Sequence, residues 1–351
     1  MSLWIRIDAG AAVLSHDAPH EERSALRTAL VEARGALLSW DVVSDERFPD
    51  AEVHSPREAA GWLAEVYGDA VAAAVLTGAD TAVTLPESPE LLDAVHRLGR
   101  LLWAADWWPA GIQIPALDAA LLAAETAVAA HAVAHLLDDD DATERALAQA
   151  TAAPSTLAAI AADFPADAAA LLDAITAVAD DHGIELSPAL PGADAAEWAL
   201  AAGAHAAADE GIELSQGSAL VRWADVPAQT VAADSDARWS LRHVGGASQL
   251  HVSVAAVPGA KAELWARFGP ESVDIDIPLH SNGVLFTGRA PVAASVALLP
   301  HDERTLWVRD PLLAPTTDAT ESDDDRAALL ACAQQRLGDP HASLTERAAG
   351  A

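Results

Sequence analysis

PELLDAVHRLGRLLWAADWWPAGIQIPALDAALLAAETAVAAHAVAHLL, residues 89–137, predicts two long helices joined by a turn rich in proline and glycine. Ser88 followed by Pro89 is a helix-start signal, a capping hydroxyl before a residue with a pre-set φ. An apolar arc covers two adjoining faces of the first helix, at Leu91, Leu92, Val95, Leu98, Leu102, Trp103 and Trp107. Since one neighbour cannot cover so wide an arc, we expect this helix to pack between at least two others.

The helix pair is expected to form the core of an α-rich helical domain spanning residues 1–225, with short strands near the N-terminus. Alternation predicts such strands at 3–7 and 40–43. Apolar spacing predicts helices over 21–38 and 55–76, and alanine-rich helices follow the central pair.

From about Arg238 the apolar period changes from 3.6 to 2, as in half-buried strands. Gly245-Gly246, Pro258-Gly259 and Asn282-Gly283 supply turns between the short runs. We therefore predict a small antiparallel β-sandwich over 236–310, followed over 311–351 by an acidic linker and a C-terminal helix. The expected fold class is α+β and multidomain.

The chain is strongly acidic, with 53 Asp and Glu residues against 20 Lys and Arg residues among 351, a net charge of −33. Phosphate-backbone binding needs several cations on one face, so nucleic acid is an unexpected partner. The acidity favours a basic partner, although adaptation to salt would give the same composition. Cys332 is the only cysteine, which excludes internal disulfides and paired-cysteine zinc sites.

The expected cellular location follows from the absence of a recognisable signal peptide or membrane span in the sequence. The N-terminus, MSLWIRIDAG, has no basic segment followed by a long apolar run, so no signal peptide is expected. The most apolar stretch, residues 116–137, is broken by charged and histidine side chains and does not resemble a membrane span. We expect a cytoplasmic protein that does not bind membranes.

His131 and His135 are the only metal-site candidates, because their spacing would let two imidazoles on one helix share a metal ion. Position 132 is Ala, so the pair is not part of an HExxH motif, and catalytic zinc needs a third protein ligand that no nearby residue supplies. The alternative is that His131 and His135 are packed or boundary histidines without a metal, which is the commoner role of histidine on an apolar helix face. The acidic runs 138–141 and 323–325 are expected to be a solvated loop and a helix start. No catalytic residue and no cofactor is predicted.

Tryptophan and arginine alternate with apolar residues in two predicted strands. Trp265 and Arg267 in one strand, and Trp307 and Arg309 in the other, fall on the outward register. Exposed Trp and Arg together are typical of interface anchors, so these four residues are the predicted partner-binding site. Trp108, beside a proline, is a further candidate for exposure. The alternative is that another part of the chain covers these tryptophans.

Two segments, DWWPAGIQIPALDAALLAAE (106–125) and AELWARF (262–268), resemble uncharacterised proteins of GC-rich actinobacteria that are encoded beside sigma factors and caspase-like CHAT proteases. The resemblance covers these short segments and no catalytic motif. It implies an accessory role in a multi-protein defence or signalling module.

The expected function is therefore that of a non-enzymatic adaptor or regulatory subunit. Its partner would be a protein, either a protease or a basic protein, and the sequence leaves the oligomeric state open. A metal-assisted hydrolase built on His131 and His135 is the alternative.

Overall fold

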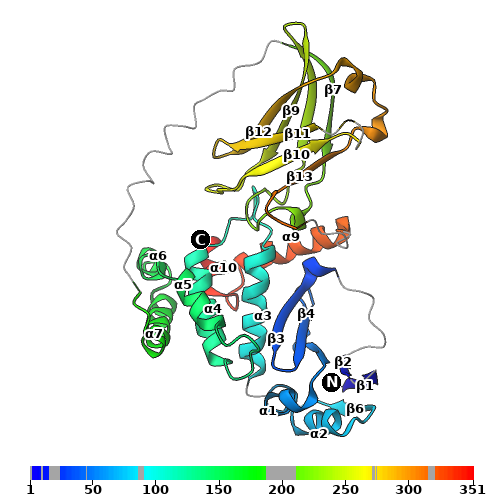
Figure 1. Ribbon diagram of the computed structural model, residues 1–351. Helices are drawn as coiled ribbons and strands as arrows, with labels where there is room; N and C mark the ends of the chain where they lie inside the picture. The colour runs from blue at the N-terminus through cyan, green and yellow to red at the C-terminus, as the bar shows by residue number, and fades with distance from the viewer. Residues whose placement is uncertain are drawn as a thin grey trace. The chain divides into compact units, whose positions relative to one another are not determined.

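The structure is a computed structural model that describes residues 2–8, 11–15, 24–44, 46–85, 91–186, 211–270, 273, 275–314 and 321–351 (Figure 1). The chain divides into two compact units, and each is described by itself. The α/β unit comprises Met1–Asp106, Leu117–Leu190 and Ser322–Ala351. The β unit comprises Trp107–Ala116 and Pro191–Glu321.

The α/β unit contains a six-stranded antiparallel sheet with the strand order β3-β4-β5-β2-β1-β6. Its strands are β1 (Ser2–Asp8), β2 (Ala11–Ser15), β3 (Thr28–Ala33), β4 (Ala36–Asp41), β5 (Asp50–Val53) and β6 (Thr81–Thr84). The prediction of an α-rich helical domain with only short N-terminal strands is therefore wrong, because this unit is built on a sheet of six strands.

The largest local error is the helix predicted over 21–38. In its described part the chain forms a short 3-10 turn, η1 (Ala25–Arg27), and then the hairpin of β3 and β4. Every second residue of β3, namely Ala29, Val31 and Ala33, points into the core. Two of these three are alanines, whose small side chains make the period of 2 hard to recognise in the sequence. Gly35, at φ +75°, makes the tight turn between the strands.

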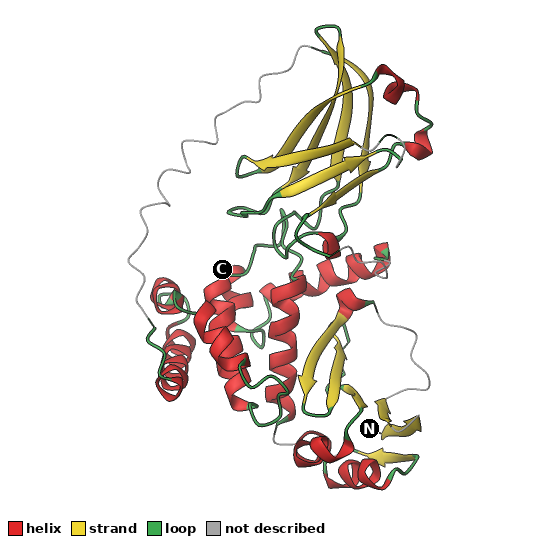
Figure 2. Ribbon diagram, viewed as in Figure 1, coloured by secondary structure: helices red, strands yellow, loops and turns green. Residues whose placement is uncertain are grey.

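The helices of the α/β unit are drawn in red in Figure 2; some pack against the sheet and others form a core of their own. They are α1 (Pro56–Tyr67), α2 (Asp69–Thr77), α3 (Leu92–Trp107), α4 (Ala119–Ala132), α5 (Ala142–Gln149), α6 (Ala153–Ile160), α7 (Pro165–His182), α9 (Asp323–Leu337) and α10 (Leu344–Ala349). The pair predicted from residues 89–137 is thus present as α3 and α4. The predicted helix start at Ser88 and Pro89 lies outside the described residues.

Helix α3 packs against the sheet. A Cβ atom at Gly99 would lie 3.1 Å from the ring of Trp40 on β4, and the Trp103 Nε1–H donates a hydrogen bond of 2.7 Å to the Leu26 carbonyl. One neighbour of the wide apolar arc is therefore a sheet instead of the second helix that was expected. Helix α4 packs with α5, α6 and α7 around a separate core that includes Leu121, Leu147, Leu157, Ile175 and Leu344.

The β unit is built on one seven-stranded antiparallel sheet with the order β13-β10-β11-β12-β9-β8-β7. Its strands are β7 (Ile212–Ala219), β8 (Ala237–Val244), β9 (Ala247–Ala255), β10 (Leu264–Phe268), β11 (Ile275–Ser281), β12 (Leu285–Val292) and β13 (Leu306–Arg309). Short 3-10 turns accompany them at η3 (Trp223–Asp225), η4 (Ala294–Leu298) and η5 (His301–Glu303). Strand β7 precedes the range 236–310, to which the predicted β-sandwich was confined.

This sheet curls into a half-barrel, so the predicted sandwich of two separate sheets is wrong. The curl brings the two edge strands near each other, since Arg304, just before β13, donates a hydrogen bond of 2.7 Å to the Ser215 hydroxyl on β7. Strands β11 and β12 pair over only two residues, around the turn at Gly283. Beyond that turn, Gly288 leaves room for the Pro278 carbonyl, which a Cβ atom would approach to 2.5 Å.

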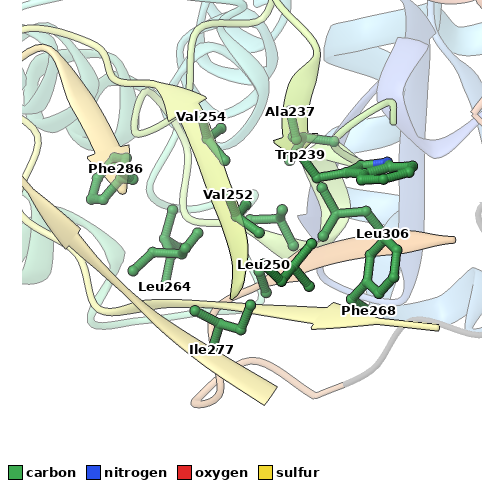
Figure 3. Packing of buried hydrophobic residues seen from close by; sticks show 14 of the residues in the cluster. Ala237, Trp239, Leu250, Val252, Val254, Leu264, Phe268, Ile277, Phe286 and Leu306 are labelled. Carbon is green, nitrogen blue, oxygen red and sulfur yellow. The ribbon is translucent and has the colours of Figure 1, made fainter. Parts of the chain in front are cut away.

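Apolar side chains from nearly every strand fill the inside of the curl (Figure 3). They include Trp239, Leu250, Val252, Leu264, Phe268, Phe286 and Leu306. Because strand side chains alternate between faces, the residues between these core positions form the outer face of the same sheet.

Candidate functional site

Two tryptophans and two arginines form a compact array on the outer face of the β unit. Trp265 on β10 pairs with Arg309 on β13, and Arg267 on β10 pairs with Trp307 on β13. The four residues, which we call the Trp–Arg quartet, alternate along both strands with buried core residues. Each tryptophan therefore has an arginine as its cross-strand neighbour, at a separation where side chains contact each other.

The two tryptophans of the quartet are held differently. The Trp307 Nε1–H donates a hydrogen bond of 2.6 Å to Oδ2 of Asp225, a carboxylate that is 3% exposed. The Arg309 guanidinium lies over the Trp307 ring, 5.2 Å from its centroid, a cation–π contact. Trp265 is 37% exposed. The quartet thus combines one fixed indole with one that presents more of its surface to solvent.

The outer face continues from the quartet into an open hollow of about 1280 Å³ over β7, β8, β9, β11 and β12. Pro278, the partner of Trp265 on β11, also lines the hollow. The register brings together two rows of polar side chains there, Arg238–Ser253–Thr287–His280 and Ser240–His251–Arg289.

The hollow is basic in a strongly acidic chain. Arg238, Arg242 and Arg289 line it against one carboxylate, Glu213, so its formal charge is 3 − 1 = +2 with neutral histidines. Glu213 lies 3.9 Å from Arg242, at the margin of an ion pair. Sequence reasoning did not single out these arginines, although the period-2 alternation that placed Trp265 outward also places them outward.

Trp108 does not belong to this surface, and the prediction of its exposure is wrong. Its side chain is 2% exposed, and its Nε1–H donates a hydrogen bond of 2.9 Å to the Pro115 carbonyl within the same short segment of the β unit. The turn between the two long helices folds back on the indole. Trp108 is therefore a buried residue of this segment and is not available to bind a partner.

His131 and His135 contact different acidic side chains. His135 lies beyond the end of α4, and its Nε2 is 3.0 Å from Glu65, whereas His131 Nε2 is 3.8 Å from Asp181. Helix α4 ends at Ala132, between the two histidines, so they do not lie one turn apart on the same helix as a shared metal ion would require. Among the residues that the structure describes, no group of three His, Cys, Asp or Glu side chains is arranged to hold a metal ion.

The acidic runs are engaged with arginines. Asp139 accepts a hydrogen bond of 2.6 Å from Arg145, which lowers the pKa of that carboxyl group, and Asp140 pairs with Arg34. Asp325, in the first turn of α9, lies 3.1 Å from Arg27. These acids hold neighbouring segments of the α/β unit together.

No protein-family model, curated protein or solved structure matches this chain. Helices in the described part of the chain all lack the combination of length and apolar character needed to cross a bilayer.

Proposed function

We propose that the protein is a non-enzymatic interaction subunit of a cytoplasmic multi-protein module, and that the outer face of its β unit binds an acidic segment of a protein partner. The observation that carries the proposal is the cross-strand pairing of Trp265 with Arg309 and of Arg267 with Trp307. The resemblance to actinobacterial proteins encoded beside CHAT proteases makes a protease a candidate partner.

Three physical features support this proposal. Tryptophan and arginine are the side chains that contribute most to binding energy at protein interfaces. The hydrogen bond to Asp225 and the cation–π contact with Arg309 hold Trp307 in place, so binding would order fewer side chains. The basic hollow beside the quartet complements an acidic partner segment and would raise the rate of encounter.

The test is a pull-down from native lysate with quantitative mass spectrometry, comparing the wild type with Trp265→Ala and Arg267→Ala. Truncation of an interface hot-spot residue costs about 2 kcal/mol or more, a loss of about 30-fold in affinity. We expect one set of partners to be depleted in both variants while the melting temperature of Trp265→Ala stays unchanged.

Trp4→Ala is the matched control, because Trp4 is 54% exposed on β1 of the α/β unit. It should retain every partner that the quartet variants lose. Equal capture by wild type, Trp265→Ala and Arg267→Ala would contradict an interface at the quartet.

A further inference from the structure

A cavity of about 490 Å³ in the α/β unit concentrates arginine in a chain that has few basic residues. Four of the chain's 20 Lys and Arg residues line it: Arg97, Arg100, Arg336 and Arg347. The carboxylates in its wall are Glu125, Glu346 and Asp167, so the formal charge of the wall is 4 − 3 = +1 with neutral histidines. The chain as a whole carries −33.

Two of the three carboxylates are fully engaged with the protein and have almost no exposed surface. Glu125 accepts hydrogen bonds from Arg97, from the Leu344 and Thr345 backbone N–H groups and from the Thr345 hydroxyl. Glu346 accepts two from Arg336 and one from the Ser343 backbone N–H. Burial would raise the pKa of Glu346, but Arg336 and Arg100 outweigh that effect and lower it.

The arginines, by contrast, have donors to spare. Each guanidinium carries five N–H groups, about twenty for the four residues. In the described part of the chain their hydrogen bonds number six: one from Arg97, two from Arg100, two from Arg336 and one from Arg347. Hydrogen bonds therefore occupy fewer than a third of the donors. Arg100 and Arg336 also lie 3.6 Å from Glu346 and Asp339, and the Arg97 side chain is 56% exposed.

The rest of the wall is partly apolar. Leu101, Val128 and Leu171 line the cavity together with several alanines. Small-molecule sites are typically concave spaces of about 300–1,000 Å³ that combine an apolar lining with a few convergent polar groups. Guanidinium groups match carboxylate and phosphate oxygens in geometry as well as in charge.

We propose that this cavity binds a small organic polyanion, a molecule that carries two or more carboxylate or phosphate groups on a compact carbon skeleton. The spare arginine donors would hold its anionic groups, and the apolar part of the wall would contact its carbon atoms. This site is independent of the proposed partner interface, because every residue that lines it belongs to the α/β unit.

The test is isothermal titration calorimetry on the full chain with citrate and with fructose 1,6-bisphosphate, each against NaCl at matched ionic strength. Saturable binding of one molecule per chain supports the site, and the better probe distinguishes carboxylate from phosphate chemistry. Absence of saturable binding for both probes would overturn the proposal, since the arginines would then serve only to hold the helices together.

Arg347→Gln locates the site, because its partner Asp167 is itself partly exposed and the variant leaves the Glu125 and Glu346 contacts in place. Removing one charge-assisted contact should weaken binding about tenfold or more. Arg145→Gln is the matched control, since Arg145 also pairs with a single aspartate but lies outside the cavity. Unchanged affinity in Arg347→Gln, or an equal loss in Arg145→Gln, would rule the cavity out.

A second measurement uses the wild-type protein, so it does not require that any variant folds. Phenylglyoxal modifies accessible arginine side chains, and peptide mass mapping identifies the modified positions. The bound probe should protect Arg97 and Arg347 from modification and leave Arg145 unprotected. Equal modification of Arg97 with and without the saturating probe would count against the site.

Discussion

Glu125, in the middle of α4, accepts hydrogen bonds of 2.9 and 2.7 Å from the backbone N–H and the hydroxyl of Thr345 in α10, 220 residues later in the chain. Both side chains are 1% exposed. The carboxylate thus satisfies donors at the start of a six-residue helix that would be too short to be stable by itself. It fixes the C-terminal end of the chain to the centre of the α/β unit.

Replacing this carboxylate should destabilise the α/β unit. In Glu125→Ala the backbone N–H groups of Leu344 and Thr345 remain buried without an acceptor, and each such group costs about 1–3 kcal/mol. We expect the free energy of unfolding in urea to fall by about 2 kcal/mol or more. Glu52→Ala, at an exposed strand position, is the control and should change it little. Equal stability of the two variants would contradict an anchoring role.

The stability of the protein should fall as the pH drops through the titration of His96. Burial lowers the pKa of His96 in the folded chain, Arg100, Arg336 and Arg47 lower it further, and only Asp93 raises it. In the unfolded chain the same imidazole takes up a proton near pH 6.5. The stability that the neutral ring contributes is therefore present above about pH 6.5 and is lost on acidification below it.

Urea unfolding of wild type and His96→Gln at about pH 7.5 and about pH 5.5 measures this contribution. The wild type should lose more stability on acidification than His96→Gln. His54→Gln, which alters an exposed histidine, should behave like the wild type. A loss in His96→Gln as large as that of the wild type would assign the pH dependence to other groups.

Two glycine substitutions should act in opposite directions. A Cβ atom at Gly288 would lie 2.5 Å from the Pro278 carbonyl, so Gly288→Ala forces β11 and β12 apart and should cost about 1–3 kcal/mol. Gly61, inside α1, has no atom within 4 Å of the added Cβ, so Gly61→Ala should stabilise the protein by about 0.5–1 kcal/mol. Thermal unfolding followed by circular dichroism separates the two. A neutral Gly288→Ala would show that the strands can move apart at no cost.

The two tryptophans of the quartet should differ in their effect on stability. Trp307→Phe removes the Nε1–H that donates to the buried Asp225 carboxylate, and should lower the free energy of unfolding by about 1–3 kcal/mol. Trp265→Phe keeps an aromatic ring at a partly exposed position and should leave stability unchanged. Urea unfolding followed by circular dichroism makes the comparison. Similar losses in both variants would mean that Trp265 is also held by a structural contact.

Local periodicity by itself determined part of this structure. The 3.6-residue repeat in the first part of residues 89–137 predicts α3, because apolar side chains with that period lie on one side of a helix. Helix α4 is apolar on nearly all sides, and its length and its many alanines favour a helix. The period of 2 after Arg238 likewise determined most strands of the β unit and the outward direction of Trp265 and Trp307. Alternation is a property of each strand, so it holds whatever the strand packs against.

Only the tertiary structure decided how these elements pair. The six-stranded sheet of the α/β unit joins β2 to β5 and β1 to β6, strands that do not follow each other in the chain, and no local pattern records such pairings. The curl of the second sheet, which replaces the expected sandwich with a half-barrel, brings the edge strands β7 and β13 near each other, and no local pattern of the sequence records that approach. Trp108 was buried by the fold of its own turn, against its expected exposure.

The arginine-lined cavity is the feature that the sequence predicted least. Its walls come from α3, α4, α7, α9 and α10, and the contacts between Glu125 and Thr345 or between Arg100 and Glu346 join residues more than 200 positions apart. From the sequence alone, a charged residue is expected to lie on the solvated surface. Whether it is paired with an opposite charge depends on which distant segment packs against it. The position of the charges was determined by the sequence, and their burial and pairing were decided by the fold.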